Sequence, residues 1–132
     1  NSQTLARFFY HILQIPKSDE PMRVPKWIFT SPYSVKIAFL KQAFDMEGTI
    51  LKSLNEIRFI TKDKDFAFDL KALLNSLRID SFVKERIGGT HRTIQYRISI
   101  YRKENFIKFT NIGFRSNFLK NRFNMLLNKH KI

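Results

Sequence analysis

Two carboxylates, Asp45 and Glu47, end an apolar segment of the chain and stand directly before Gly48. A carboxylate at the buried end of a helix is unfavourable unless a cation pairs with it or it binds a ligand. The chain around these acids is strongly basic, so general charge balance does not account for them. A metal ion that must meet a polyanion accounts for both facts.

The positive charge gathers in the C-terminal part of the chain. The formal net charge is +13 over 132 residues, and residues 82–132 hold 12 of the 24 basic residues but only two of the 11 acidic ones. Such a concentration is typical of a surface that binds a polyanion. We favour nucleic acid, with an anionic membrane surface and an acidic protein as the alternatives.

The composition indicates one folded domain, because 43% of the residues are hydrophobic and 14% are aromatic. No apolar run approaches the roughly 18 residues that span a bilayer, and no signal peptide is visible. The absence of cysteine excludes disulfides, thiolate zinc sites and cysteine nucleophiles. We therefore expect a cytoplasmic protein without a membrane partner. The sequence begins with Asn1 rather than Met, which leaves open that residues precede it.

The first 30 residues differ in character from the rest. Apolar residues at helical spacing predict a helix that ends at Pro16, and all four prolines lie within residues 16–32, which predicts a connector. Four apolar residues of the connector are suited to dock on the domain: Val24, Trp27, Ile28 and Phe29. We divide the chain into residues 1–30, the N-terminal helix and connector, and residues 31–132, the main domain.

The main domain reads as a helix, two strands, a helix, two strands and two helices. Its first helix starts at Ser31-Pro32, runs to about Met46 and stops at Gly48. From Arg92 to Tyr101 apolar and polar residues alternate, so one face of that strand is apolar and the other is free for a ligand. Helices on one face of an antiparallel sheet make an α+β domain with an open face.

The segment from Leu40 to Gly48 resembles the nine-residue motif of the LAGLIDADG homing endonucleases. The landmarks that follow resemble the rest of one repeat, as in archaeal and intein-borne members of the family. They are Arg58 through Thr61-Lys62-Asp63 to Leu73-Leu74, then Leu77-Arg78-Ile79, and Asn105-Phe106 through Ile112-Gly113-Phe114 to Lys120. The resemblance covers about residues 31–127 and implies an α-β-β-α-β-β-α-α repeat. The N-terminal helix and connector look like the tail of a preceding repeat.

The resemblance also implies roles for particular residues. In the family two repeats pack through their motif helices, the last acid of each motif binds a divalent metal, and the sheets lie in the DNA major groove. Glu47 matches that metal-binding, catalytic acid. Asp45 matches the earlier acid, a second candidate ligand that is more often structural. Lys120 and Arg97 are candidates for holding the scissile phosphate. Mg²⁺ suits such a site because it prefers oxygen ligands.

Four residues of the motif helix are expected at the interface with the second repeat: Ala38, Gln42, Ala43 and Met46. Gln42 and Met46 stand where the family usually has small residues, so the two helices would lie further apart.

Seven polar or basic residues of the strands and turns are candidates for DNA binding: Lys52, Arg58, Lys84, Arg86, Arg92, Gln95 and Arg97. Arg and Gln can make bidentate contacts with guanine and adenine edges, whereas phosphate contact carries no sequence information. The alternative for each of them is a solvated strand face.

Two main hypotheses follow. The first is a homing endonuclease repeat of an intein-related or other mobile element, which binds double-stranded DNA and hydrolyses phosphodiesters site-specifically with Mg²⁺. It needs a second repeat, from a homodimer or from a missing first half of the same chain. The second is a non-catalytic DNA- or RNA-binding protein of the same fold, such as a regulator or splicing cofactor. A weaker third is an adaptor for an acidic protein.

Overall fold

A four-stranded antiparallel sheet organises residues 22–132, the part of the chain that the computed structural model describes. The helix predicted before Pro16 lies outside these residues. The strand order is β1-β2-β4-β3, with strands β1 Gly48–Ile50, β2 Ile57–Thr61, β3 Phe82–Gly88 and β4 Thr93–Ile100.

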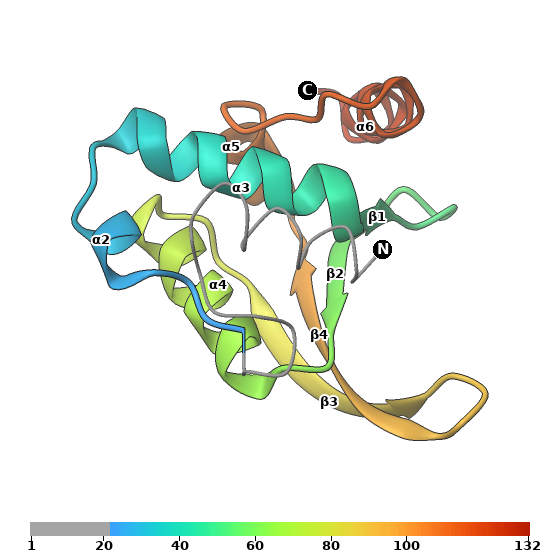
Figure 1. Cartoon of the computed structure of the whole chain (residues 1–132). Helices are drawn as coiled ribbons and strands as arrows, with labels where there is room; N and C mark the ends of the chain where they lie inside the picture. Colours follow the sequence, from blue (N-terminus) through green and yellow to red (C-terminus); the bar gives the residue numbers. More distant parts are fainter. Residues whose placement is uncertain (1–21) are drawn as a thin grey trace.

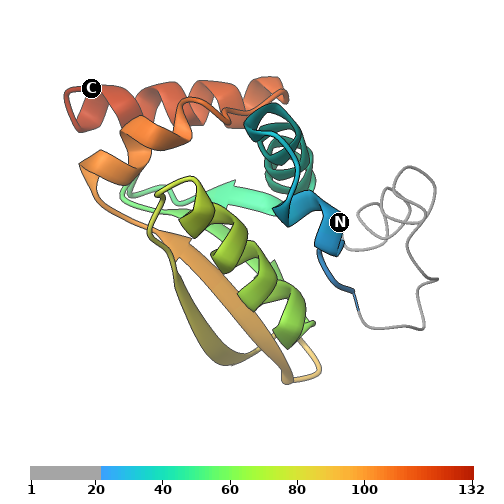
Figure 2. The same ribbon diagram turned by 90° about the vertical axis from the view of Figure 1, so that its left-hand side faces the viewer.

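Helices cover one face of this sheet, and the β3–β4 hairpin extends beyond them (Figure 1). The helices within the described residues are α2 Lys26–Phe29, α3 Tyr33–Glu47, α4 Lys64–Ser76, α5 Lys103–Phe109 and α6 Asn117–Lys129. Figure 2, seen from the side of α4, shows the sheet behind that helix. The predicted α+β class and the predicted order of elements from residue 31 are confirmed. The single-turn helix α2 was not predicted.

The two faces of the sheet differ because side chains alternate along each strand. Ile57 and Phe59 of β2, and Ile98 and Ile100 of β4, are buried against the helices. The Phe59 ring lies 5.3 Å from that of Phe44 on α3 and 6.1 Å from that of Phe66 on α4. Aromatic contacts between elements that are distant in sequence therefore hold α3 and α4 on the sheet.

The connector docks through part of its apolar surface. Val24 and Ile28 are buried in the core, whereas Trp27 is 51% exposed, so the expectation that it docks is wrong. One turn of helix has a single buried face, and Ile28 occupies it. The Ser31 hydroxyl donates to the Trp27 carbonyl at 2.6 Å, so it closes α2 instead of capping α3.

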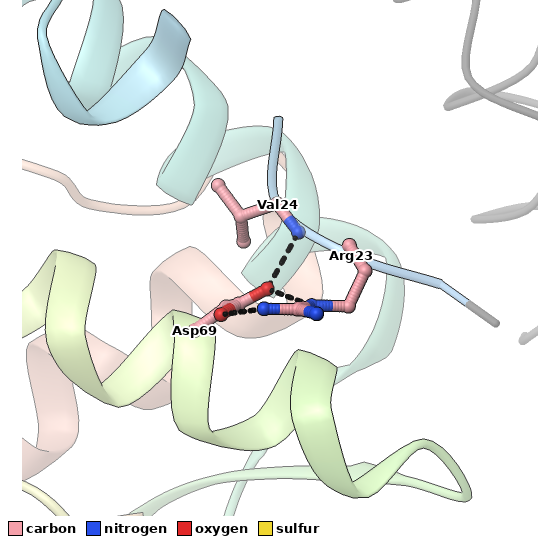
Figure 3. A network of polar contacts seen from close by, with 3 residues as sticks. All are labelled: Arg23, Val24 and Asp69. Carbon is pink, nitrogen blue, oxygen red and sulfur yellow. Dashed lines mark hydrogen bonds and ion pairs between the residues drawn. The ribbon is translucent and has the colours of Figure 1, made fainter. Parts of the chain in front are cut away.

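An ion pair ties this connector to α4 (Figure 3). Asp69 accepts from Arg23 Nε at 2.7 Å and Nη2 at 3.1 Å, and from the backbone N–H of Val24 at 3.1 Å. The Arg23 side chain is 57% exposed, so its ionic contribution is small. The backbone hydrogen bond, beside the buried Val24 side chain, fixes the direction of the segment.

Helix α3 passes directly into β1 at Gly48. The Gly48 N–H bonds to the carbonyl of Phe44, and the residue then turns to an extended conformation, φ −77° and ψ 158°. A Cβ at this position would overlap the Phe44 carbonyl oxygen. Glycine is therefore required by close approach of the backbone, and it delivers the end of α3 to the edge of the sheet.

Asp45 joins α3 to the start of α6. Its Oδ1 accepts hydrogen bonds of 2.8 Å from the backbone N–H groups of both Arg115 and Ser116. Ser116 is the N-cap of α6, and its hydroxyl accepts from Leu119 N. A carboxylate near a helix N-terminus also interacts favourably with the helix dipole. Asp45 thus has a structural function in this domain.

The C-terminal end of α6 holds the loop between β1 and β2. Lys129 Nζ donates to the Ser53 carbonyl at 2.6 Å, and His130 Nε2 lies 2.8 Å from the Leu54 carbonyl. Arg122 Nη1 donates to the Ile50 carbonyl at 3.2 Å. These contacts order a short hairpin that lacks a longer strand ladder of its own.

We predict that Gly48→Ala destabilises the domain by roughly 1–3 kcal/mol, because the new methyl group meets a backbone carbonyl that cannot rotate away. Urea denaturation followed by circular dichroism measures the change. Gly88→Ala is the matched control, since its Cβ would meet only the flexible Gln95 side chain. Equal stabilities of the two variants would contradict the steric account.

We predict that Asp45→Ala destabilises the domain by about 1–3 kcal/mol, since it leaves two backbone N–H groups without their acceptor. Asp45→Asn keeps an oxygen at the same place and should lose less. Hydrogen exchange should locate the effect in the first turn of α6. Unchanged exchange there in Asp45→Ala would show that this contact does not hold α6.

Candidate nucleic-acid interface and acidic site

The face of the sheet away from the helices is basic. The register pairs Arg58 with Ser99, Arg97 with Lys84, and Arg86 with Gln95. Because these residues alternate with the buried ones along each strand, they share the side of the sheet that none of the helices in residues 22–132 covers. We call the surface formed by Arg58, Lys84, Arg86, Gln95 and Arg97 the open face. Five of the seven predicted DNA-binding residues thus come together on one side of the sheet.

The other two predicted DNA-binding residues lie in turns. Arg92 ends the β3–β4 turn, with φ of 54°, and its N–H bonds to the Gly89 carbonyl at 3.2 Å. Lys52 is exposed in the loop between β1 and β2. Both stand at the ends of hairpins rather than on the open face.

A buried carboxylate lies among the cations of the open face, and sequence reasoning missed it. Glu56 is 5% exposed. It accepts from Arg58 Nε at 2.7 Å and Nη2 at 3.1 Å, and from the Ser99 hydroxyl at 2.6 Å. Burial alone would raise the pKa of Glu56, but the hydrogen bonds from Arg58 and Ser99 and the nearby arginines hold it below its usual value. Glu56 is therefore ionised at neutral pH.

Arg97 is the other unusual cation of this surface. Within the described residues its buried Nε has no hydrogen-bond partner. Burial and the neighbouring charges of Arg58 and Arg86 lower the pKa of Arg97, although a guanidinium stays protonated at neutral pH. Burial and the like charges outweigh the attraction of Glu56 for this guanidinium, so a further anion such as a phosphate would stabilise it.

Glu47 lies at the end of α3, directly before β1. It is half-buried, with Oε1 enclosed, and burial raises the pKa of its carboxyl group above the usual value. Thr49, two residues later, pairs with Arg58 across the sheet. The acid therefore stands at the edge of the basic surface and not in bulk solvent. A cation that reached it would offset the cost of burying its charge.

The described residues fit a divalent cation only in part. Among them, no group of three His, Asp or Glu side chains could hold a metal ion. Glu47 offers the oxygen ligand that Mg²⁺ prefers. Asp45 is two residues away, but its Oδ1 already accepts two backbone hydrogen bonds. The described residues of one chain therefore bring only Glu47 forward as a candidate metal ligand.

The predicted phosphate-holding residues lie on different elements. Arg97 is on the open face, whereas Lys120 is exposed in the first turns of α6. Helix α6 packs beside β1, where Arg122 reaches the Ile50 carbonyl. Lys120 therefore belongs to the helix layer, and its side chain is free to meet solvent or a partner.

The predicted helix-interface residues divide into two groups. Ala38 is exposed, and Gln42 and Met46 are partly exposed, so these three can meet a partner helix. Ala43 is fully buried with Phe39, Leu40 and Phe44 in the core of this domain. A side chain with no exposed surface cannot contact a second repeat directly, so Ala43 instead allows α3 to approach its own core closely.

Comparison with known proteins identifies the family. The family described as LAGLIDADG-like domain matches residues 34–113, more than half of the chain. The chain is 26% identical over 117 residues to a probable translation initiation factor IF-2 of Methanocaldococcus jannaschii, covering 87% of this chain and 10% of that protein.

Two DNA polymerases are also similar over short segments. That of Pyrococcus horikoshii is 35% identical over 85 residues, which cover 64% of this chain and 6% of the polymerase. That of Thermococcus kodakarensis is 33% identical over 89 residues, 67% of this chain and 5% of the polymerase. The chain thus spans a tenth or less of these curated relatives. With the family match over most of the sheet and α3, the chain belongs to the LAGLIDADG-like domain family.

Proposed function

We propose that this chain is a homing-endonuclease repeat that binds double-stranded DNA through its open face and hydrolyses phosphodiesters with Mg²⁺ at Glu47. The observation that carries the proposal is the position of Glu47. A half-buried acid ends α3 and directly precedes β1, whose neighbour β2 bears Arg58; the other cations of the open face lie further across the sheet, on β4 and β3. DNA held there would present its phosphates to the acid.

A second repeat would complete the site. One chain offers Glu47 and the already engaged Asp45, and two acids on separate motif helices would share the metal. Ala38, Gln42 and Met46 are exposed enough to form the contact between helices. A homodimer and a partner repeat of the same polypeptide both satisfy this requirement.

A Mg²⁺ ion held by Glu47 and a second acid would supply Lewis-acid chemistry, lowering the pKa of a bound water and stabilising negative charge on the phosphate. The protein would hold the metal ion and orient the phosphate. Glu47 provides an oxygen ligand, and Arg97 is placed to bind phosphate on the open face. Burial raises the pKa of Glu47, and a bound cation would offset the cost of burying the ionised carboxylate.

The relatives support a mobile origin for the domain. The same type of segment matches a small part of an initiation factor and of DNA polymerases, proteins whose names describe different activities. A segment shared between such proteins is not what gives either its named activity. We therefore infer an intein-related or other mobile element, acting on DNA in the cytoplasm. No helix within the described residues is long and apolar enough to cross a membrane.

A second candidate is a non-catalytic DNA- or RNA-binding protein of the same fold, such as a regulator or splicing cofactor. Gln42 and Met46 favour it, because larger side chains hold two motif helices further apart. Strand β1, with three residues, also gives the first hairpin little length to follow a groove. Both observations argue against cleavage at a specific site, and neither argues against binding of nucleic acid.

We predict that Glu47→Gln abolishes Mg²⁺-dependent cleavage of duplex DNA that includes the sequence flanking the gene, because an amide oxygen is a weaker ligand than a carboxylate. Gel electrophoresis of the cleavage products measures activity, and fluorescence anisotropy measures binding, which should persist. Nicking by the variant at the rate of the unmodified protein would remove Glu47 from the mechanism. Binding without any cleavage by the unmodified protein would favour the second candidate.

We predict that Arg97→Gln weakens duplex binding roughly tenfold and reduces the slope of log affinity against log salt concentration by about one, because one phosphate contact is lost. Lys64→Gln is the charge-matched control, since Lys64 is exposed on α4 on the helix side of the sheet. Equal losses in the two variants would mean that the open face is not the DNA surface.

A further inference from the structure

Glu56 is the only buried charged residue within the described part of the chain, and it lies on a surface that is otherwise basic. An acid facing a phosphate backbone lowers affinity, so its presence on a DNA-binding surface needs a reason. A buried carboxylate without partners would also be strongly unfavourable. The hydrogen bonds that Glu56 accepts from Arg58 and Ser99 explain its presence there.

Both carboxylate oxygens of Glu56 are used to position Arg58. Oε1 accepts from Nη2, while Oε2 accepts from Nε and also from the Ser99 hydroxyl. Ser99 lies directly opposite Arg58 in the register of β2 and β4. The guanidinium is therefore held by a two-point contact whose acceptor is itself fixed from the neighbouring strand. A planar fork held in this way has lost most of its rotational freedom before a ligand arrives.

One edge of the Arg58 guanidinium is not used by Glu56. Among the described residues Nη1 has no hydrogen bond, and the side chain keeps 17% of its surface exposed. Nη1 and the second N–H of Nη2 form a pair of parallel donors. Such a pair matches the O6 and N7 acceptors of guanine in the major groove. The same donors also fit a phosphate. The charge around Arg58 therefore has to decide whether its partner is a guanine or a phosphate.

Glu56 forms a direct ion pair with Arg58, whereas its attraction for Arg97 does not offset the effects of burial, Arg58 and Arg86 on that guanidinium. A neutral ion pair gains little from approaching phosphate and releases few counterions. A base edge carries no net charge, so its recognition depends on the directions of the hydrogen-bond donors that face it. Arg97, with its crowded guanidinium and buried Nε, has the opposite character. The open face thus holds one arginine whose donor directions are fixed, Arg58, and one that is suited to bind a charged phosphate, Arg97.

We propose that Arg58 is a specificity-determining residue that reads a guanine in the major groove, and that Glu56 and Ser99 are the positioning residues that hold it. The inference rests on the proposed binding of duplex DNA. Arg97, Lys84 and Arg86 supply the phosphate contacts around it.

The experiment selects binding sites from a random-sequence duplex pool with the full chain and with two variants of equal net charge. Glu56→Gln combined with Arg58→Gln removes the fork and the acid together, so no buried charge is left unpaired. Arg58→Lys keeps one donor for Glu56 and loses the fork. In both we expect the preference for guanine at one position to fall roughly 5- to 100-fold, with the salt slope unchanged.

Lys84→Gln is the contrasting variant, because Lys84 is an exposed cation opposite Arg97. It should weaken binding to all sequences, lower the salt slope by about one and leave the guanine preference intact. Circular dichroism establishes that each variant is folded. If the double variant does not fold, Arg58→Lys carries the test, since it retains the ion pair.

Three results would overturn the inference. Full retention of guanine preference in the folded variants would remove Arg58 from base recognition. A uniform loss of affinity with a reduced salt slope would make Arg58 a phosphate contact. Selection of no preferred sequence by the unmodified chain, although it binds duplex DNA, would leave nothing for Arg58 to read. Absence of duplex binding by the unmodified chain would instead refute the proposed function itself.

Discussion

The junction at Gly48 is the constraint on which the rest of the site depends. The backbone N–H of Gly48 bonds to the Phe44 carbonyl, and the chain enters β1 without a loop, in a space that excludes a Cβ. No loop intervenes between the last turn of α3 and the edge of the sheet. Glu47 is consequently fixed half-buried beside a strand, where a side chain on a flexible connection would turn to water.

The two parts of the sheet surface carry buried charges of opposite sign. At the β1 edge a carboxylate has its pKa raised by burial and gains from a cation. Across β2, β4 and β3 the cations outnumber the acids, and one of them, Arg97, has its pKa lowered by burial and by like charges. A cation near Glu47 and an anion near Arg97 would each offset a buried charge, which supports our proposal that this surface binds DNA together with a divalent cation.

Much of the fold could be predicted because the sequence patterns that indicate it lie within short segments. The helix that ends at Gly48 and the alternation along β4 can be read from neighbouring residues, and the α+β class follows from them. Trp27 and Ser31 could not be assigned correctly, because the unpredicted turn of α2 exposes the former and engages the latter. Glu56 was missed for another reason. Its partner Ser99 is 43 residues away, and only the pairing of β2 with β4 brings the two together.

Nuclear magnetic resonance titration of the chain with duplex DNA locates the surface that contacts the double helix, which we propose is the open face of the sheet. We expect the resonances of Arg58, Gln95 and Arg97 to shift, and those of exposed α4 residues such as Lys64 and Asn75 to stay unchanged. Shifts confined to α4, with the strands of the open face unaffected, would contradict this proposal.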